Sequence, residues 1–182
     1  MNIPTVLTIL RLIAVPVLVV TLLVPFHRHE LVSFVIFVAA CLTDMLDGFW
    51  ARRKKMETIL GSLLDPLADK LLITSALICL VGNGVVASWM AVIIIGRELA
   101  ITGFRAMASS RGYNIPASRW GKIKMIFETV IVAILILGPH YLGSLYRLAH
   151  AYGLWLVVVF ALISAAEYFV RFGPLVLKET SD

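Results

Sequence analysis

Four aspartates occur as two closely spaced pairs in stretches that are otherwise almost wholly apolar. Asp44 and Asp47 are three residues apart, and Asp65 and Asp69 are four apart. On a helix both spacings place side chains on one face, so the members of each pair can act together. Four converging carboxylates repel one another unless some are protonated or cations lie between them. Oxygen ligands without histidine or cysteine favour Mg²⁺, Mn²⁺ or Ca²⁺, and two such ions can clamp a phosphoryl group during transfer.

Two alternative roles for these acids remain open. They could pair with Arg52 and Lys70 to stabilise the fold, or they could line a cation pathway in a transporter. Each aspartate at a membrane-helix centre costs about 2.5–3.5 kcal/mol on the insertion scale, so four acids need partners. Transporters often contain a second, matching half, whereas this chain contains the acids once. The metal site is therefore the favoured interpretation.

A second polar cluster lies further along the chain. Glu98, Thr102 and Arg105 share one face of a predicted helix, and Arg97 lies to the side. Lys122 opens the next predicted helix. Glu98 cannot neutralise all three of these cations, and the surplus charge suits a phosphate, which arginine grips with two hydrogen bonds. The cluster predicts a binding site for the phosphate of an acceptor substrate.

The elements that must position these residues are membrane helices. The 182-residue chain is 60% hydrophobic, with a mean hydropathy of +0.96, whereas soluble domains are about 45–50% apolar. A bilayer core is crossed by about 20 apolar residues of helix. Six stretches are predicted to span it: 5–26, 31–50, 64–82, 88–107, 123–141 and 152–175. We therefore expect one all-α membrane domain over residues 1–182, with an N-terminal interfacial segment before Pro16 redirects the chain.

The basic residues predict the orientation of these helices. They gather after the second and fourth stretches, and positive residues remain in the cytoplasm, so both termini are expected there. The second and third stretches are then antiparallel neighbours, and the four aspartates converge in a cavity that faces the cytoplasm. The net charge of +5 reflects this topology and attraction to anionic headgroups, and we find no nucleic-acid module. Simple contact with headgroups is the strongest alternative for three cations: Arg111, Arg119 and Lys124.

The spacing of the acids resembles a known family signature. The string Asp44-x-x-Asp47-Gly48-x-x-Ala51-Arg52, followed after eight residues by Gly61-x-x-x-Asp65-x-x-x-Asp69, is similar to that of the CDP-alcohol phosphatidyltransferases. The resemblance implies six helices in a homodimer and two Mg²⁺ or Mn²⁺ ions on the first three acids. It also implies that Asp69 is the general base and a further metal contact. It implies a CDP site at Thr5, Asp47, Gly48, Ala51, Arg52 and Gly61.

The second cluster resembles one bacterial branch of that family, the phosphatidylglycerophosphate synthases. The similar segments are Asn2-Ile3-Pro4-Thr5, Arg97-Glu98-x-x-Ile101-Thr102-Gly103-x-Arg105 and Gly121-Lys122-Ile123-Lys124. This resemblance implies transfer from CDP-diacylglycerol to glycerol 3-phosphate in a bacterial inner membrane, with Arg97, Arg105 and Lys122 on the acceptor phosphate. Inositol phosphate and phosphatidylglycerol remain open as acceptors.

Overall fold

The computed structural model describes the backbone of residues 3–54, 59–110 and 119–177, and the side chains of 7–43, 68, 70–110 and 120–173. The described residues form helices joined by short turns, and no β-strand occurs among them. The elements are α1 (Ile3–Leu23), α2 (His29–Lys54), α3 (Ile59–Gly82), α4 (Ser88–Ser110), α5 (Arg119–Leu142), α6 (Ser144–Leu148), η1 (Ala149–Gly153) and α7 (Leu154–Leu177). The predicted all-α class is confirmed, and each predicted stretch corresponds to one long helix.

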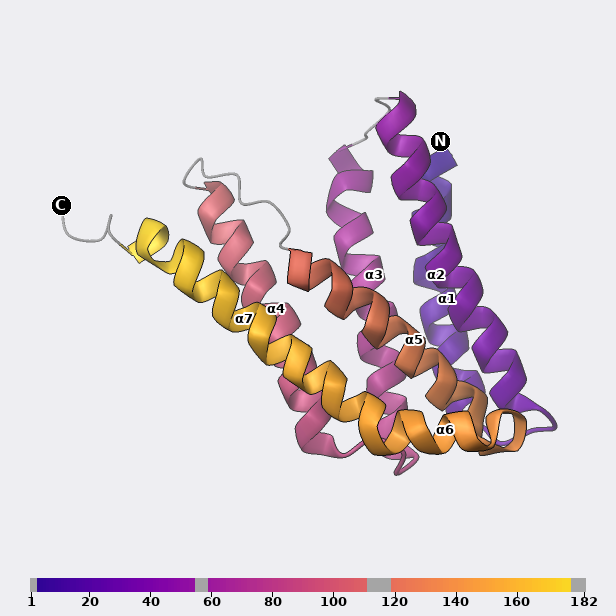
Figure 1. The fold of residues 1–182 in the computed structure, drawn as a ribbon. Helices are drawn as coiled ribbons and strands as arrows, with labels where there is room; N and C mark the ends of the chain where they lie inside the picture. Colours follow the sequence, from indigo (N-terminus) through magenta and orange to yellow (C-terminus); the bar gives the residue numbers. More distant parts are fainter. Residues whose placement is uncertain (1–2, 55–58, 111–118, 178–182) are drawn as a thin grey trace.

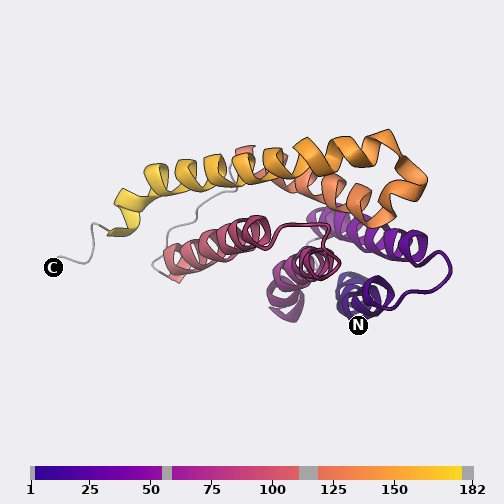
Figure 2. The same ribbon diagram turned by 90° about the horizontal axis from the view of Figure 1, so that it is seen from below.

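Successive long helices run in opposite directions (Figure 1). The start of α1, the end of α2 and the start of α3 therefore lie toward one end of the molecule, together with the end of α4 and the start of α5. Seen from below, α5 and α7 lie along one side, and α1, α3 and α4 along the other (Figure 2). The buried core that joins them includes Leu18, Phe37, Leu72, Leu77, Ile94, Val132, Leu135 and Val157.

The first helix differs from the sequence prediction. α1 is one unbroken helix from Ile3 to Leu23, with Pro16 inside it. Thr8 and Arg11 are 0% and 1% exposed, so they do not lie along a membrane surface. They belong to the helix face that packs on α2 and α3. The opening residues are therefore part of the first long helix, and the predicted interfacial segment is wrong in this respect.

The outer faces of the helices are apolar. Large exposed hydrophobic side chains occur on every long helix, including Val20, Val35, Ile78, Val92, Ile126 and Val170. Two stretches, Trp120–Leu142 and Ser144–Gly173, are long and apolar enough to cross a bilayer. Shorter apolar stretches occur at Leu7–Leu23, His29–Thr43 and Lys70–Gly82. Apolar side chains exposed on this scale mark a surface that contacts other apolar material, which indicates a membrane protein.

The end of α5 turns sharply at Gly138. Its φ of 78° lies in the left-handed region that favours glycine, and Pro139 follows. A Cβ atom at this position would lie 2.7 Å from Oε1 of Glu30 in α2. The chain then passes through α6 and the π-helical η1 into α7. This turn joins the lower ends of α2 and α5, away from the positions of the acids.

Candidate active site

The four predicted metal ligands lie on two neighbouring helices. Positions 44 and 47 belong to α2, and positions 65 and 69 belong to α3. On α2 the buried stripe runs through Ser33, Phe37 and Ala40. The same alternation of four and three residues continues to positions 44 and 47. These two positions therefore lie on the same face of α2 as the buried stripe. The side chains of the four aspartates lie outside the described residues.

The chemistry of this donor set fits a divalent metal. Among the side chains that the structure describes, no group of three or more His, Cys, Asp or Glu could hold an ion. The aspartates of α2 and α3 lie outside that set. They offer carboxylate oxygen without nitrogen or sulfur, which is the preference of Mg²⁺ and Mn²⁺.

The predicted CDP-binding residues share one end of the bundle. Thr5 is in the first turns of α1, Gly48, Ala51 and Arg52 are in the last turns of α2, and Gly61 opens α3. The side chains at these positions are outside the described residues, so their roles stay predictions. Their backbone positions lie at the end of the molecule that also contains the acids (Figure 1).

A buried ion network connects α4 with α5. Oε1 of Glu98 accepts hydrogen bonds from Nη1 of Arg97 and from Nζ of Lys124, each at 2.6 Å. Nζ of Lys124 also donates to Oε2 of Glu128 at 2.6 Å. The Lys124 and Glu128 side chains are 0% and 2% exposed. With two cations and two anions the network is neutral, which makes its burial tolerable.

The remaining nitrogens of Arg97 reach α7. Nε and Nη2 both donate to Oγ of Ser164, at 3.0 and 2.7 Å. The Arg97 side chain is only 8% exposed. All three of its nitrogens therefore have partners within the protein, and its guanidinium fixes α4 against α7.

A third contact joins this network to α3. Nζ of Lys70 donates to Oγ1 of Thr102, whose hydroxyl donates to the carbonyl of Glu98. Lys70 follows Asp69 directly in the sequence. The contact therefore ties the acid-bearing part of α3 to the face of α4 that contains the network.

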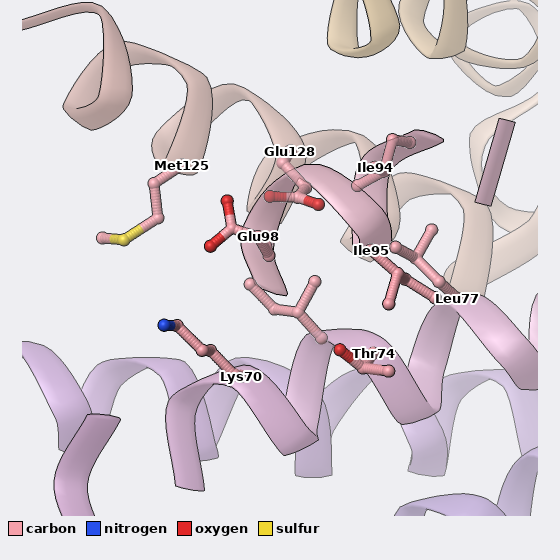
Figure 3. A pocket seen from close by; sticks show the side chains of 9 residues that line it. Lys70, Thr74, Leu77, Ile94, Ile95, Glu98, Met125 and Glu128 are labelled. Atoms are coloured by element: carbon pink, nitrogen blue, oxygen red, sulfur yellow. The ribbon is translucent and has the colours of Figure 1, made fainter. Parts of the chain in front are cut away.

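A small cavity lies between these helices. Lys70 reaches toward it from α3, and Glu98 and Glu128 line its other side (Figure 3). Its volume is about 30 Å³, roughly what a single water molecule requires.

The structure divides the three predicted phosphate ligands. Arg97 belongs to the buried network, whereas Arg105 and Lys122 are exposed. Neither exposed cation has an ion pair with any described residue. Eight residues separate Arg105 from Arg97, which is about 12 Å along α4. The surplus positive charge that the sequence predicted is thus on Arg105 and Lys122.

Two members of the network were missed by the sequence analysis. Lys124 was assigned to headgroup contact as readily as to a site, and Glu128 was not singled out. The available signal was their spacing of four residues in an otherwise apolar helix, which favours an ion pair.

The family comparison decides between the chemistries that such a bundle could support. The family model for CDP-alcohol phosphatidyltransferase matches residues 1–164 of the chain. The chain belongs to the CDP-alcohol phosphatidyltransferase family. The resemblance carried by the aspartate motif is thereby confirmed.

Bacterial relatives of this phosphatidyltransferase have similar lengths. A CDP-diacylglycerol–glycerol-3-phosphate 3-phosphatidyltransferase of Bacillus subtilis is 36% identical, over 93% of this chain and 94% of its own. A probable phosphatidylglycerophosphate synthase of Mycobacterium tuberculosis is also 36% identical, over 93% of this chain and 81% of its own. A CDP-diacylglycerol–glycerol-3-phosphate 3-phosphatidyltransferase of Rickettsia bellii is 31% identical, over 92% and 93%.

Membership also bears on the metal. CDP-alcohol phosphatidyltransferases generally depend on divalent metal ions. The donor set on α2 and α3 agrees with this requirement.

Proposed function

We propose that this phosphatidyltransferase transfers the phosphatidyl group of CDP-diacylglycerol to glycerol 3-phosphate, releasing CMP and phosphatidylglycerophosphate. The observation that carries the proposal is the similarity to the Bacillus relative, whose name states this reaction, over nearly the whole of both chains. The exposed cations Arg105 and Lys122 support a phosphorylated acceptor, because an uncharged alcohol would not need them.

The metal site is assigned to the first three aspartates. Asp44, Asp47 and Asp65 hold two divalent ions, Mg²⁺ or Mn²⁺, and Asp69 is a further contact. When bound, these ions neutralise the diphosphate of the donor and the charge that develops on the departing CMP. The pairs of positions one turn apart on α2 and α3 support this assignment.

Asp69 is assigned as the general base. Its carboxylate accepts the proton of the glycerol 3-phosphate hydroxyl, and the freed oxygen forms a bond to the phosphorus that carries diacylglycerol. The bond from that phosphorus to the oxygen of the CMP phosphate breaks, and CMP leaves with the electron pair. The remaining residues contribute by holding the two substrates in line.

The nucleotide is assigned to the end of the bundle. Gly48, Ala51 and Gly61 leave room for cytidine beside the helices, and Thr5, Asp47 and Arg52 supply polar contacts. Support for this assignment comes from the family motif and from the common position of these residues at the ends of α1, α2 and α3.

Arg97, Arg105 and Lys122 are assigned to the acceptor phosphate. Arg105 and Lys122 are exposed and can contact the phosphate directly. Arg97 would have to exchange Ser164 or Glu98 for the phosphate, so its direct contact has the least geometric support of the three.

The enzyme is assigned to the bacterial cytoplasmic membrane. We propose six membrane spans, both termini in the cytoplasm, an active site that opens to that side, and a homodimer. The alternating helix directions support the even number of spans, because α1 begins and α7 ends toward the same side (Figure 1). The concentration of basic residues near these helix ends supports the orientation.

The experiment that tests the reaction measures CMP release by the purified chain in detergent. CDP-diacylglycerol and Mg²⁺ are supplied with glycerol 3-phosphate, inositol phosphate, serine or phosphatidylglycerol separately, and EDTA is the control. We expect metal-dependent release with glycerol 3-phosphate alone. Release with a different acceptor would retain the family chemistry and remove the assignment of the basic residues. No release with any acceptor would contradict the proposed reaction and favour a cation pathway.

Asp69→Asn tests the base. We expect turnover to be nearly abolished while the helical content and melting temperature stay close to those of the unaltered protein. Full activity in this variant would remove the assignment of Asp69.

A further inference from the structure

The buried face of α1 changes character along its length. Four of its residues are at most 5% exposed and lie on one stripe: Thr8, Arg11, Leu18 and Leu22. The half-buried Val15 completes the alternating spacing of three and four. The stripe faces α2 and α3, on which α1 packs (Figure 2). It is apolar toward the end of α1 and polar toward its start.

A hydrogen bond sets the register of α1 against the antiparallel α2. Oγ of Ser33 donates to Oγ1 of Thr21 at 2.9 Å. Arg11 precedes Thr21 by ten residues, and position 44 follows Ser33 by eleven, so both lie about 15–17 Å above this bond. By the same measure Thr8 and position 47 both lie about 20 Å above it.

A second hydrogen bond sets the register against the parallel α3. Nδ2 of Asn83 donates to the carbonyl of Leu22 at 3.1 Å. Thr8 precedes Leu22 by fourteen residues, and position 69 precedes Asn83 by the same number. Both are therefore about 21 Å above this bond, and Arg11 lies about one turn deeper. Two independent contacts thus place the polar half of α1 at the depth of the acids.

We propose that Arg11 is a positioning residue of the metal site. Its guanidinium, at the depth of Asp44 and about one turn deeper than Asp69, orients the metal-binding carboxylates of α2 and α3. The inference rests on the proposed metal site. A guanidinium that is 1% exposed inside a helical bundle is costly unless charged or hydrogen-bonding partners lie within its reach. On α2 the residue at its depth is Asp44, and on α3 Asp69 lies about one turn above it.

The residue type supports this role. Arginine presents its donors in a planar fork, which can hold carboxylates from two helices at once, whereas lysine offers a single charged nitrogen. Ligating carboxylates are commonly held by outer hydrogen-bond partners, and loss of such a partner typically costs 10–100-fold in metal affinity or activity.

Arg11→Lys is the decisive variant, because it retains the buried charge and removes only the fork. The full chain in detergent is titrated with Mn²⁺, and the free ion is counted by electron paramagnetic resonance, without substrates. We expect the half-saturating Mn²⁺ concentration to rise about tenfold, with the helical content unchanged. Unchanged or tighter Mn²⁺ binding would overturn the proposal.

Thr21→Val is the matched control. It removes a polar contact from the other end of the same helix pair, so it should leave Mn²⁺ binding unaltered. An equal loss of Mn²⁺ affinity in both variants would show that general packing is responsible and would overturn the proposal.

A measurement on the unaltered chain covers the case in which Arg11→Lys does not fold. The ¹⁵N resonance of the Arg11 guanidinium should shift when Mg²⁺ is added, and an unmoved resonance would overturn the proposal. If the unaltered chain neither binds Mn²⁺ nor releases CMP, the proposed function fails. If it does both and Arg11→Lys matches it, this inference alone fails.

Discussion

Four cations on α4 and α5 occupy two contrasting environments. Arg97 and Lys124 are buried, and their nitrogens are held by Glu98, Glu128 and Ser164. Arg105 and Lys122 lie on the same two helices but are exposed, without an ion pair in the described part of the chain. Lys122 and Lys124 are only two residues apart.

This contrast separates two uses of positive charge. The buried pair is neutralised inside the protein and fixes three helices, so its removal should affect the fold first. The exposed pair retains an unneutralised charge, so its removal should affect a ligand first. Substitutions at Lys124, Arg105, Ser164 and Thr102 test this division.

Lys124→Met should cause the largest loss of stability. It leaves Glu98 and Glu128 with Arg97 as the remaining cation of the network, and breaking a buried ion pair in this way costs about 3–5 kcal/mol. Unfolding of the purified protein in detergent measures this loss. Lys122→Met is the control, and it should keep a melting temperature close to that of the unaltered protein. Similar losses of stability in the two variants would show that the buried and the exposed cations do not differ in their contribution to the fold.

Arg105→Ala should act on the acceptor. A hydrogen bond to a charged group contributes about 1.5–3 kcal/mol, so the KM for glycerol 3-phosphate should rise at least about tenfold. The KM for CDP-diacylglycerol and the melting temperature should stay nearly constant. Steady-state kinetics with each substrate varied in turn provide the test. Equal increases in both KM values would argue against a dedicated acceptor site.

Ser164→Ala should destabilise the contact between α4 and α7. The variant leaves Nε and Nη2 of the buried Arg97 without their acceptor, which costs about 1–2 kcal/mol. The loss should appear in unfolding measurements. Ser110→Ala is the matched control, because Ser110 is exposed and bonds only within its own helix. If the control loses as much stability, the hydrogen bonds between Arg97 and Ser164 do not contribute measurably to stability.

Thr102→Val should have the smallest effect, about 1 kcal/mol, because it removes one hydrogen bond between Lys70 and α4. Thr129→Val isolates this contribution. Both hydroxyls donate to a carbonyl four residues earlier, but only Thr102 also accepts a bond from Lys70. The difference between the two variants in unfolding free energy therefore measures the link between α3 and α4. Equal unfolding free energies in the two variants would mean that the bond between Lys70 and Thr102 does not contribute to stability.

Much of the helix arrangement could be predicted from the sequence. Apolar runs of about 20 residues leave little choice of secondary structure in a membrane, since backbone groups must be satisfied internally. The burial of Lys124 was also predictable in principle. It shares a stripe with Glu128, Ile131 and Leu135, at alternating spacings of four and three, whereas Lys122 does not.

Other features required the three-dimensional structure. Arg97 and Ser164 are 67 residues apart in sequence, and no local pattern links them. The depth of Arg11 likewise depends on contacts with Thr21–Ser33 and Leu22–Asn83, because periodicity gives the buried face of a helix but not the height of its neighbours. The roles of the aspartates and of the nucleotide-binding residues stay predictions.

The apolar stretch through α6, η1 and α7 has a consequence for the host membrane. The stretch covers 30 residues, Ser144–Gly173, and changes direction between α6 and α7 (Figure 1). α7 alone has 24 residues and extends about 36 Å, whereas the hydrocarbon layer is about 30 Å thick. Such a helix cannot stand upright without hydrophobic mismatch, and its tilt must follow the length of the surrounding acyl chains. Arg97 of α4 donates two hydrogen bonds to Ser164 of α7, so a change in the tilt of α7 should reach α4. We therefore expect turnover in vesicles to peak at one lipid chain length. Turnover that does not vary with lipid chain length would refute this coupling. An enzyme that makes phospholipid would then respond to the thickness of the bilayer that its own product helps to build.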